Sequence, residues 1–314
     1  MNVSPLISVA LCTYNGAKFL NEQLDSLVGQ TYPNLEIVAV DDGSSDGTLA
    51  ILNQYAARYP FLRVHQNETN LGFNLNFEKA LRLCTGDYLA ISDQDDVWDP
   101  EKLRLQFEAL GTHQLIYHDS AFVDESGASI SYRVSDKMAF YRGDRPEVFL
   151  YLNCVSGHSV LLRKSVLDHA LPLPAAFPKG YYYDQWITYI ATGLGTITYL
   201  PQCLVKYRLH HQNTTDMLAQ KQQKRPLEQK INALKEESEW LRLCAGKAPA
   251  SAAPLVEKLY RQSLKRNASW GYFPYGLTIW KHRRTLLFLL KKKAISKFFF
   301  TLRKVWGIPA KRLL

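Results

Sequence analysis

Hydrophobic residues follow two alternating periodicities along the first 110 residues of the chain. The runs at 6–12 (LISVALC) and 35–40 (LEIVAV) are compact and apolar, as expected for strands buried on both faces of a sheet. Residues 17–28, between these runs, repeat apolar side chains at helical spacing. The alternation continues downstream, with helices predicted over 46–59, 74–83 and 100–110 and strands predicted over 62–65 and 88–92.

Strands that alternate with helices of this length predict βαβ units and a mostly parallel sheet flanked by helices, which is an α/β fold. Ligands bind such sheets at the carboxyl ends of the strands. The segments directly after three of the predicted strands are polar, and two of them are rich in aspartate: 13–15, 41–44 and 93–96. We therefore expect a site where these three segments meet.

The second half of the chain has a mixed pattern and then a change of composition. Short helices are predicted over 146–152 and 165–170, short strands over 159–162 and 196–199, a proline-rich loop over 171–179 and a helix over 183–191. After residue 213 the pattern predicts an amphipathic helix over 228–243 and a small-residue linker over 245–254. We predict a domain boundary after residue 217, with a helical region over 218–314.

Three carboxylates lie within four residues at 93–96 (DQDD). Like charges this close repel one another unless a cation or several hydrogen-bond donors compensate them. The spacing of Asp93 and Asp95 lets alternate carboxylates converge on one hard divalent ion, which prefers oxygen ligands. The alternative is a solvated loop that caps the next helix, because Asp99 and Pro100 follow directly.

The segment 41–44 (DDGS) also ends a predicted strand. Asp42 can accept hydrogen bonds from a nucleobase imide or a ribose hydroxyl, as acidic groups do in other nucleotide-binding folds. A turn is the alternative interpretation, with Gly43 supplying a positive φ and Ser44 or Asp46 capping the next helix.

Several motifs together resemble family 2 glycosyltransferases, with the closest similarity to bacterial rhamnosyltransferases. In order, the motifs are VALCTYNG at 9–16, DDGSSDGT at 41–48, NLG at 70–72, TGDY at 85–88 and DQDD at 93–96. The resemblance covers roughly residues 5–213. It implies the GT-A fold, a Rossmann-like, mostly parallel sheet flanked by helices, over 1–217, and a nucleoside-diphosphate sugar as the donor.

The resemblance also implies which residues bind the donor and a divalent ion, Mg²⁺ or Mn²⁺. Arg208 and His210 belong to a YRLHHQN segment at 207–213, where the histidine completes the metal or diphosphate site and His211 is the alternative. Asp96 either contacts the sugar or supports a metal ligand. The expected donor-binding residues are Thr13, Tyr14, Asn15, Asp42, Gly72, Asp93 and Arg208, and the expected metal ligands are Asp93, Asp95, Asp96 and His210.

Asp184 matches the family's catalytic base, which would deprotonate the acceptor hydroxyl in an inverting reaction. A helix N-cap is the alternative role for it. The expected acceptor-binding residues are Gly157, His158, Tyr183 and Trp186, although a turn and aromatic core packing would explain them equally. Many relatives carry an arginine after the Asn-x-Gly motif that helps to hold diphosphate. This chain has Asn74, Asn76 and Lys79 in that region, which leaves more charge neutralisation to the metal.

The net charge of +9 is concentrated at the end of the chain. Residues 258–314 carry 15 Lys and Arg and no acid, whereas the remainder has 23 bases and 29 acids. Because Trp, Phe and Leu lie among these bases, the tail is typical of an interfacial segment on an anionic membrane. A solvated appendage or a dimer contact is the alternative. Nucleic acid is a poor fit, since the acidic body would oppose it and no recognition motif is present.

The five cysteines form no CxxC pair, and no apolar run approaches the ~20 residues of a membrane span. We expect a cytoplasmic protein, peripheral on the cytoplasmic face of the membrane. The predicted function is inverting transfer of a sugar, first of all L-rhamnose from dTDP-rhamnose or otherwise a hexose from UDP, to a saccharide or lipid-linked acceptor in polysaccharide synthesis. The rivals are a metal-dependent nucleotidyltransferase and a non-catalytic sugar-nucleotide-binding or membrane scaffold protein.

Overall fold

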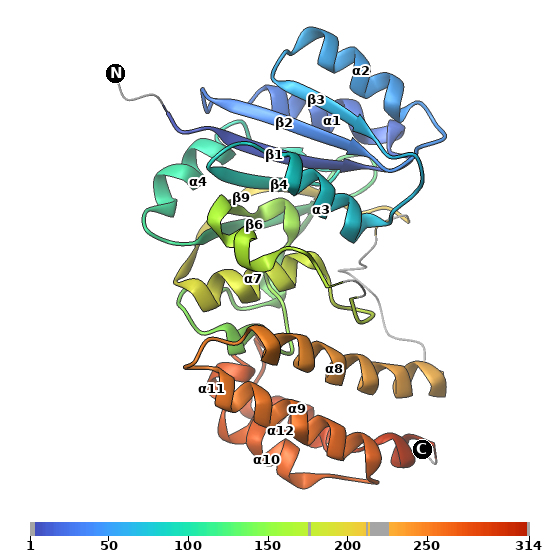
Figure 1. Cartoon of the computed structure of the whole chain (residues 1–314), viewed down its shortest axis with the longest axis vertical. Helices are drawn as coiled ribbons and strands as arrows, with labels where there is room; N and C mark the ends of the chain where they lie inside the picture. Colours follow the sequence, from blue (N-terminus) through green and yellow to red (C-terminus); the bar gives the residue numbers. More distant parts are fainter. Residues whose placement is uncertain (1–3, 175–176, 212, 214–225, 313–314) are drawn as a thin grey trace.

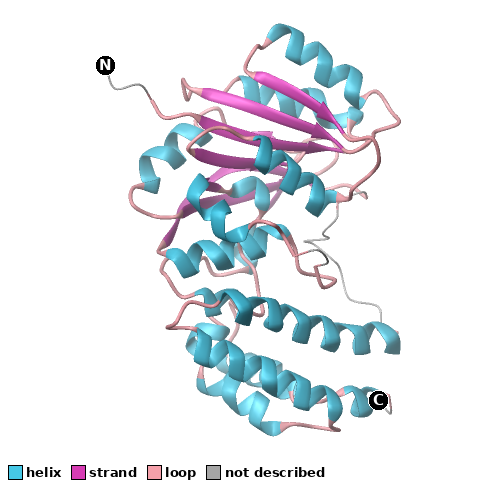
Figure 2. Cartoon of the chain, viewed as in Figure 1, coloured by secondary structure: helices cyan, strands magenta, loops and turns pink. Residues whose placement is uncertain are grey.

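A curled mixed sheet runs through the first two thirds of the chain, and a group of helices follows it (Figures 1 and 2). The computed structural model describes residues 4–174, 177–211, 213 and 226–312. The predicted boundary between residues 217 and 218 lies outside these residues. Within them, nine strands form one sheet in the order β3-β2-β1-β4-β8-β6-β9-β5, with β7 paired to β6.

The first half of the sheet is parallel, as predicted. Its central strand β1 is buried at all seven positions, which is why its sequence is continuously apolar. The register pairs Thr13 of β1 with Asp41 of β2, and Leu11 of β1 with Ser92 of β4. The three polar segments therefore leave the sheet at the same edge. The elements are β1 (Ile7–Thr13), α1 (Ala17–Val28), β2 (Leu35–Asp41), α2 (Thr48–Arg58), β3 (Leu62–Gln66), α3 (Phe73–Leu83) and β4 (Tyr88–Ser92).

The second half of the sheet departs from the prediction. The strand β6 was not predicted, because the polar residues His118, Asp119 and Ser120 interrupt its apolar pattern. β9 pairs with β6 over its whole length and is far longer than the strand predicted at 196–199, with register shifts between His118 and Ser120. These elements are β5 (Val97–Trp98), α4 (Lys102–Leu110), β6 (Leu115–Val123), β7 (Ser129–Arg133), α5 (Val134–Lys137), β8 (Leu161–Arg163), α6 (Leu167–Ala170), α7 (Tyr183–Leu194) and β9 (Ile197–Arg208).

Three short 3₁₀ turns lie between β7 and α6. They span Pro146–Phe149, Gly157–Ser159 and Lys164–Val166. The helix predicted over 146–152 stops after its first turn. The chain then forms a loop in which the Asn153 side chain accepts the backbone N–H of Val155 and donates to its carbonyl oxygen. Such local side-chain bonds compete with helix formation.

The sheet separates two hydrophobic cores. Helices α1, α2 and α4 cover one face through residues such as Leu24, Leu52 and Leu103. Helices α3 and α7 cover the other face, where the core continues without a break into the C-terminal helices. Trp240 and Tyr275 belong to the same buried cluster as the α7 residues.

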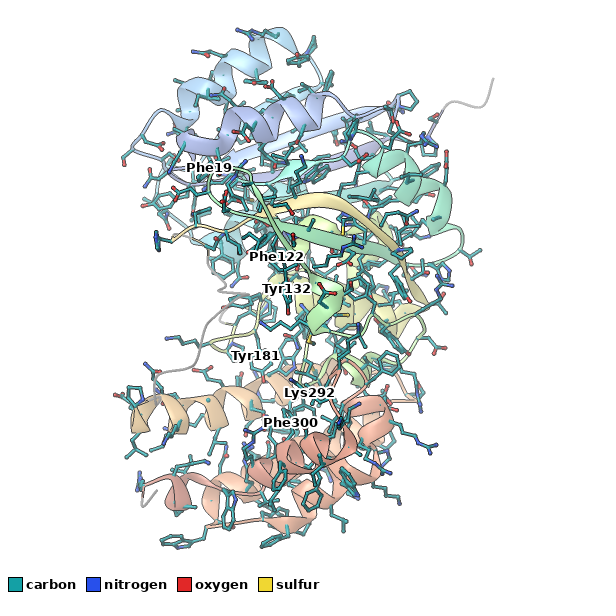
Figure 3. The ribbon with its side chains drawn as sticks, turned by 180° about the vertical axis from the view of Figure 1, so that it is seen from behind. Phe19, Phe122, Tyr132, Tyr181, Lys292 and Phe300 are labelled. Atoms are coloured by element: carbon teal, nitrogen blue, oxygen red, sulfur yellow. The ribbon has the colours of Figure 1, made fainter. Side chains whose placement is uncertain are left out.

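The C-terminal region is a packed group of helices and not one extended interfacial helix. The segment predicted as a linker at 245–254 is a short turn between two antiparallel helices, and Cys244 and Ala252 are buried there. Trp240 donates from its indole nitrogen to the carbonyl oxygen of Leu150 at 3.0 Å and stacks on Tyr181, whose position Figure 3 shows. The helices are α8 (Leu227–Lys247), α9 (Ala253–Ala268), α10 (Phe273–Lys281), α11 (Arg283–Leu286), α12 (Ala294–Lys304) and α13 (Ile308–Lys311).

None of the helices in the described parts of the chain combines the length and the apolar character that crossing a membrane requires.

A buried ion cluster joins four of the C-terminal helices, α8, α9, α10 and α12, to one another. Glu237 on α8 is only 4% exposed and accepts hydrogen bonds from the guanidinium of Arg266 at 2.6 Å and the hydroxyl of Tyr275 at 2.9 Å. Lys304 of α12 also contacts its carboxylate. Arg266 is fully buried and donates a further bond to the carbonyl oxygen of Leu234. Removing the Glu237 charge would strand these cations in the core.

We expect Glu237→Gln to lower the free energy of unfolding by about 3–5 kcal/mol, because an uncompensated buried cation remains. Chemical denaturation monitored by Trp fluorescence measures this change. Glu257→Gln is the matched control, since Glu257 pairs with Arg261 at 3.0 Å on the exposed surface of α9. That exposed pair is worth no more than about 1 kcal/mol. Equal losses in the two variants would contradict the structural role of the buried cluster.

Candidate active site

A cavity of about 570 Å³ opens at the carboxyl ends of β1, β2 and β4. This is the edge at which α/β sheets bind ligands. The segments after the three strands line it together with residues from the second half of the chain. Most of the predicted site residues meet here: Thr13, Tyr14, Asn15, Asp42, Gly72, Asp93, Asp95, Gly157, His158, Tyr183, Asp184 and His210.

Asp42 holds one wall of the cavity in place. Its Oδ1 accepts the side-chain amide of Asn67 at 2.7 Å and the backbone N–H of Leu71 at 2.8 Å, and its Oδ2 accepts the N–H of Gly72 at 2.9 Å. Gly72 has a φ of +79°, which glycine adopts without strain. A carboxylate offers about four acceptor positions, so one remains on Asp42 for a ligand N–H or hydroxyl.

Asn67 was not predicted as a site residue, although it lies three residues before the NLG motif. Its side-chain amide donates to Asp42 and to the carbonyl of the buried Asn76 side chain, and its own carbonyl accepts the ammonium of Lys79 at 2.7 Å. Asn76 in turn donates to the carbonyl oxygen of Val40. Asn76 and Lys79 therefore support Asp42 through the Asn67 side chain.

Gln94 links the first and third polar segments and was likewise missed, although it lies inside the DQDD motif. Its side chain accepts the backbone N–H of Tyr14 at 2.8 Å and donates to the carbonyl oxygen of Tyr14 at 3.1 Å. The Tyr14 side chain remains 49% exposed beside the cavity. Asn15 has a positive φ of 49°, and its side chain accepts the backbone N–H of Ser45. Thr13 is buried and donates its hydroxyl to Asp41 at 3.0 Å.

The three carboxylates of the acidic loop occupy different environments. Asp93 is partly exposed to the cavity, and Asp95 Oδ2 lies 2.7 Å from Nε2 of His210. Asp96 is fully buried, and its Oδ2 has no hydrogen-bond partner. Burial, followed by the charges of Asp95 and Asp93, holds the pKa of Asp96 well above its usual range. A divalent cation would relieve both effects.

His158 lies against the acidic loop. Its Nδ1 is 3.4 Å from Oδ2 of Asp96 and 3.8 Å from Oδ2 of Asp93, so the ligand atoms of these three residues fall within 4.8 Å of one another. Its Nε2 is 2.9 Å from the hydroxyl of Ser120, and its ring stacks on Tyr207. We expected His158 on the acceptor side, and the structure also gives it the position of a candidate metal ligand. The oxygen-rich donor set fits Mg²⁺ or Mn²⁺.

Arg208 does not line the cavity. It is 2% exposed and holds the acidic loop from behind: its Nε donates to the carbonyl oxygen of Asp95, and its backbone N–H donates to Oδ1 of Asp96. The guanidinium also pairs with Glu22 at 2.6 Å. The structure therefore corrects the expectation that Arg208 contacts the donor, because its guanidinium already pairs with Glu22 and donates to the carbonyl oxygen of Asp95.

Asp184 begins α7 and faces the same cavity. Its Oδ1 accepts the backbone N–H of Gln185, the next residue of the helix, at 2.6 Å. Burial raises the pKa of Asp184 to about 7, with a further contribution from the negative charge of Asp93. A carboxyl group with a pKa near neutrality suits proton transfer at physiological pH. The N-cap position of α7 is Tyr182, and no side chain caps this helix, so the alternative role of Asp184 as an N-cap is wrong.

Two of the expected acceptor residues hold α7 against the cavity wall. Gly157 leaves room for Tyr183, because a Cβ at this position would lie 2.2 Å from the tyrosine hydroxyl. The Tyr183 ring packs on Phe77 at 4.3 Å. Trp186 is different: it is 3% exposed, lies outside the cavity lining and donates its indole N–H to the carbonyl oxygen of Ala170. It belongs to the core, which corrects its assignment as an acceptor contact.

Aromatic side chains missed by the sequence analysis close the far side of the cavity. Phe122 of the unpredicted strand β6 lines it and contacts the rings of Tyr132 and Tyr207. Figure 3 shows Phe122 beside Tyr132. Phe73 and Tyr182, which contact one another at 5.6 Å, line it from α3 and from the residue before α7. Such rings offer flat apolar faces to a sugar or a base.

Comparisons with known proteins agree with this geometry. The family model for Glycosyl transferase family 2 matches residues 8–171. An uncharacterized glycosyltransferase of Haemophilus influenzae is 30% identical over 230 residues, which cover 69% of each chain. An uncharacterized glycosyltransferase of a Nostoc species is 30% identical over 213 residues, or 66% of each chain.

Solved structures share the fold at low sequence identity. S. aureus TarS (residues 1–349, in complex with UDP-GlcNAc) aligns with a TM-score of 0.60 and 19% identity, over 83% of this chain and 72% of that one. The mannosyltransferase PcManGT from Pyrobaculum calidifontis, in complex with GDP-Man and Mn²⁺, aligns with a TM-score of 0.53 and 18% identity, over 99% and 87%. With this GT-A fold and the family match over more than half its length, the chain belongs to glycosyl transferase family 2.

Proposed function

We propose that this glycosyltransferase is a metal-dependent, inverting enzyme that moves a sugar from a nucleoside diphosphate to a hydroxyl group of a saccharide or lipid-linked acceptor in cell-surface polysaccharide synthesis. One observation carries the proposal: Asp184, with a pKa raised to about 7, faces the same cavity as the aspartates of the acidic loop. The proposed base for the acceptor and the proposed site for the leaving diphosphate thus line the same cavity.

The donor lies, in this proposal, along the edge formed by β1, β2 and β4. The free acceptor position on Asp42 takes an N–H or hydroxyl of the nucleoside, and the exposed ring of Tyr14 covers its face. The solved structures with UDP-GlcNAc and with GDP-Man support a donor of this class for the chain. We keep L-rhamnose from dTDP-rhamnose as the first choice of sugar, and a UDP-hexose as the second.

Residues Asp93, Asp95, Asp96, His158 and His210 would hold the divalent cation. The ion, when bound, supplies a Lewis acid that stabilises the negative charge on the departing diphosphate. The Mn²⁺ complex of PcManGT supports this proposal. Asp184 takes the proton of the acceptor hydroxyl as the oxygen attacks the anomeric carbon, and the diphosphate leaves from the opposite face of the sugar, which inverts the configuration.

We further propose that two parts of the chain have different functions. Residues 1–217 form the catalytic domain, and residues 218–314 form a membrane-associating region. The 15 bases and absent acids of residues 258–314 support attraction to an anionic membrane surface. The protein would thus be peripheral on the cytoplasmic face of the membrane, next to lipid-linked acceptors.

Replacement of the proposed base separates catalysis from binding. We expect Asp184→Asn to lower kcat by about 10²–10⁴-fold, because the amide cannot take the acceptor proton, while donor affinity stays unchanged. Steady-state transfer assays and calorimetric donor titration measure the two quantities. Asp168→Asn, on the exposed side of α6, is the matched control with unchanged kcat. A normal kcat in Asp184→Asn would disprove the assigned role.

The pH dependence follows from the same carboxyl group. The charged form of Asp184 is the active base, so kcat/KM rises with pH up to about 7 and then levels off. A cation beside Asp93 offsets part of the negative charge that raises the pKa of Asp184. In the metal-loaded enzyme we therefore expect the midpoint of the rise in kcat/KM at or below about pH 7. A pH–rate profile with the wild type and Asp184→Asn tests this, because the limb should vanish in the variant.

A donor panel tests the metal and the sugar together. We expect Mn²⁺-dependent hydrolysis of dTDP-rhamnose in preference to UDP-glucose, UDP-galactose, UDP-N-acetylglucosamine and GDP-mannose, and its loss with a chelator. Asp95→Ala should lower turnover by at least about a hundredfold, since the Lewis acid loses a ligand. Asp144→Ala, at an exposed loop position, is the control. If no donor binds in a metal-dependent way, the metal assignment fails and a non-catalytic binding protein becomes the better interpretation.

A further inference from the structure

Helices α10 and α12 form an antiparallel pair with an apolar groove between them. Trp280 meets Phe298 at one end, with ring centroids 5.5 Å apart, and Phe273 meets Trp306 at the other end, at 6.3 Å. Gly276 lets the two helices approach in the middle, because a Cβ there would lie 2.5 Å from a methyl group of Val305. The contact leaves aromatic side chains standing along both edges.

The groove has a volume of about 490 Å³ and is lined mostly by apolar side chains. Leu277 and Phe273 line it and are 68% and 62% exposed, and Phe298 is 43% exposed. Thr301 is polar, but its hydroxyl already donates to the carbonyl oxygen of Lys297 at 2.9 Å. Leaving so many large apolar side chains in water is costly, and patches of this kind mark surfaces that another molecule covers.

Positive charge gathers at one end of this groove only. Residues 281–293, from the last residue of α10 to the residue before α12, carry six Lys and Arg and no acid. Because the helices are antiparallel, this segment lies at the Trp280 end, where the guanidinium of Arg283 stacks on the indole ring at 4.4 Å. Lys292 and Lys293 are exposed, and they immediately precede α12, whose positive dipole end adds to the field.

The groove is therefore apolar along its length and has a cluster of cations at one end, which complements an amphiphile with a hydrocarbon chain and an anionic headgroup. We propose that the α10–α12 groove takes one hydrocarbon chain of an anionic bilayer lipid, with the lipid phosphate beside Arg283, Lys292 and Lys293. This inference rests on the membrane placement proposed above and assigns it to one face of the C-terminal helices. Figure 3 shows Lys292 and Phe300 on the side of the C-terminal helices that faces the α/β part of the protein.

Charge argues against the other occupants. A second copy of the chain would bring a further 15 bases of residues 258–314 to the interface, without acids from that region to pair with them. A peptide helix would fit the apolar slot but would need acidic residues at one end only. A bilayer provides both hydrocarbon and dense negative charge, and the exposed Phe and Trp side chains suit its interfacial layer.

Vesicle sedimentation of the full-length protein tests the groove, without donor or metal. Binding to phosphatidylcholine vesicles that contain phosphatidylglycerol should exceed binding to pure phosphatidylcholine. We expect Leu277→Asp to weaken this binding by about tenfold or more, since it places a charge in the hydrocarbon slot. Leu264→Asp is the control, because Leu264 is an exposed leucine of α9 that does not line the groove. Equal loss in both variants would overturn the assignment to this face.

The headgroup end has its own test. Lys292→Glu with Lys293→Glu should weaken binding by about tenfold or more, because each base near an anionic surface contributes about 1 kcal/mol. Lys235→Glu with Lys265→Glu changes the net charge equally, on exposed positions of α8 and α9, and should have a smaller effect. If the two pairs behave alike, the attraction is diffuse and no phosphate site exists at the end of the groove.

A chain in the groove is detected directly by quenching of Trp280 with lipids that carry bromine on their acyl chains. We expect Trp280→Phe to bind vesicles normally and to lose a large part of the quenching. Unchanged quenching would place the chain elsewhere. If the wild-type protein is a dimer in the absence of lipid and Leu277→Asp dissociates it, the groove binds a second copy of the chain and the lipid proposal is wrong. Donor turnover in solution should be normal in all these variants, so a failure of the proposed catalytic function would appear separately, as inactive wild-type protein that still binds vesicles.

Discussion

The parallel register of three strands is the constraint on which the site depends. β1 pairs with β2 and β4 so that Thr13 lies beside Asp41, and Leu11 beside Ser92. The chain leaves all three strands at one edge, and Asp42, Tyr14 and the acidic loop therefore line one cavity there. Asp42 and Gln94 then lock the segments to one another through side-chain bonds to backbone groups. A ligand therefore meets a preformed wall, which reduces the entropy lost on binding.

The second half of the chain adds a further carboxyl group, Asp184, to the cavity. The 3₁₀ turn at Gly157–Ser159 brings His158 to the acidic loop, and its glycine admits Tyr183 at the start of α7. Asp184 follows, and burial together with Asp93 moves its pKa toward neutrality. Burial raises the pKa of both Asp184 and Asp96. In the proposed mechanism, this suits Asp184 for proton transfer, whereas Asp96 would be compensated by a cation.

The C-terminal helices share a hydrophobic core with the α/β domain on one face and carry the exposed α10–α12 groove on another. Trp240 anchors α8 to the core of the α/β domain, and the Glu237 cluster holds α9, α10 and α12 to α8. This rigid attachment means that a lipid bound between α10 and α12 would orient the whole enzyme and would not merely tether it. Acceptor access would then depend on how the protein sits on the membrane.

The amino-acid sequence by itself determined the family, the parallel half of the sheet and the polar segments at its edge, because both periodicities and the motifs are local patterns. It could not show β6, whose polar residues pair with groups distant in the chain, as Ser120 does with His158. Only the tertiary structure decided that Trp186 and Arg208 turn away from the cavity, that Asn67 supports Asp42 and that the tail packs as helices on the main core. These outcomes depend on contacts between residues far apart in the sequence, where burial and hydrogen-bond satisfaction select one arrangement that no local pattern encodes.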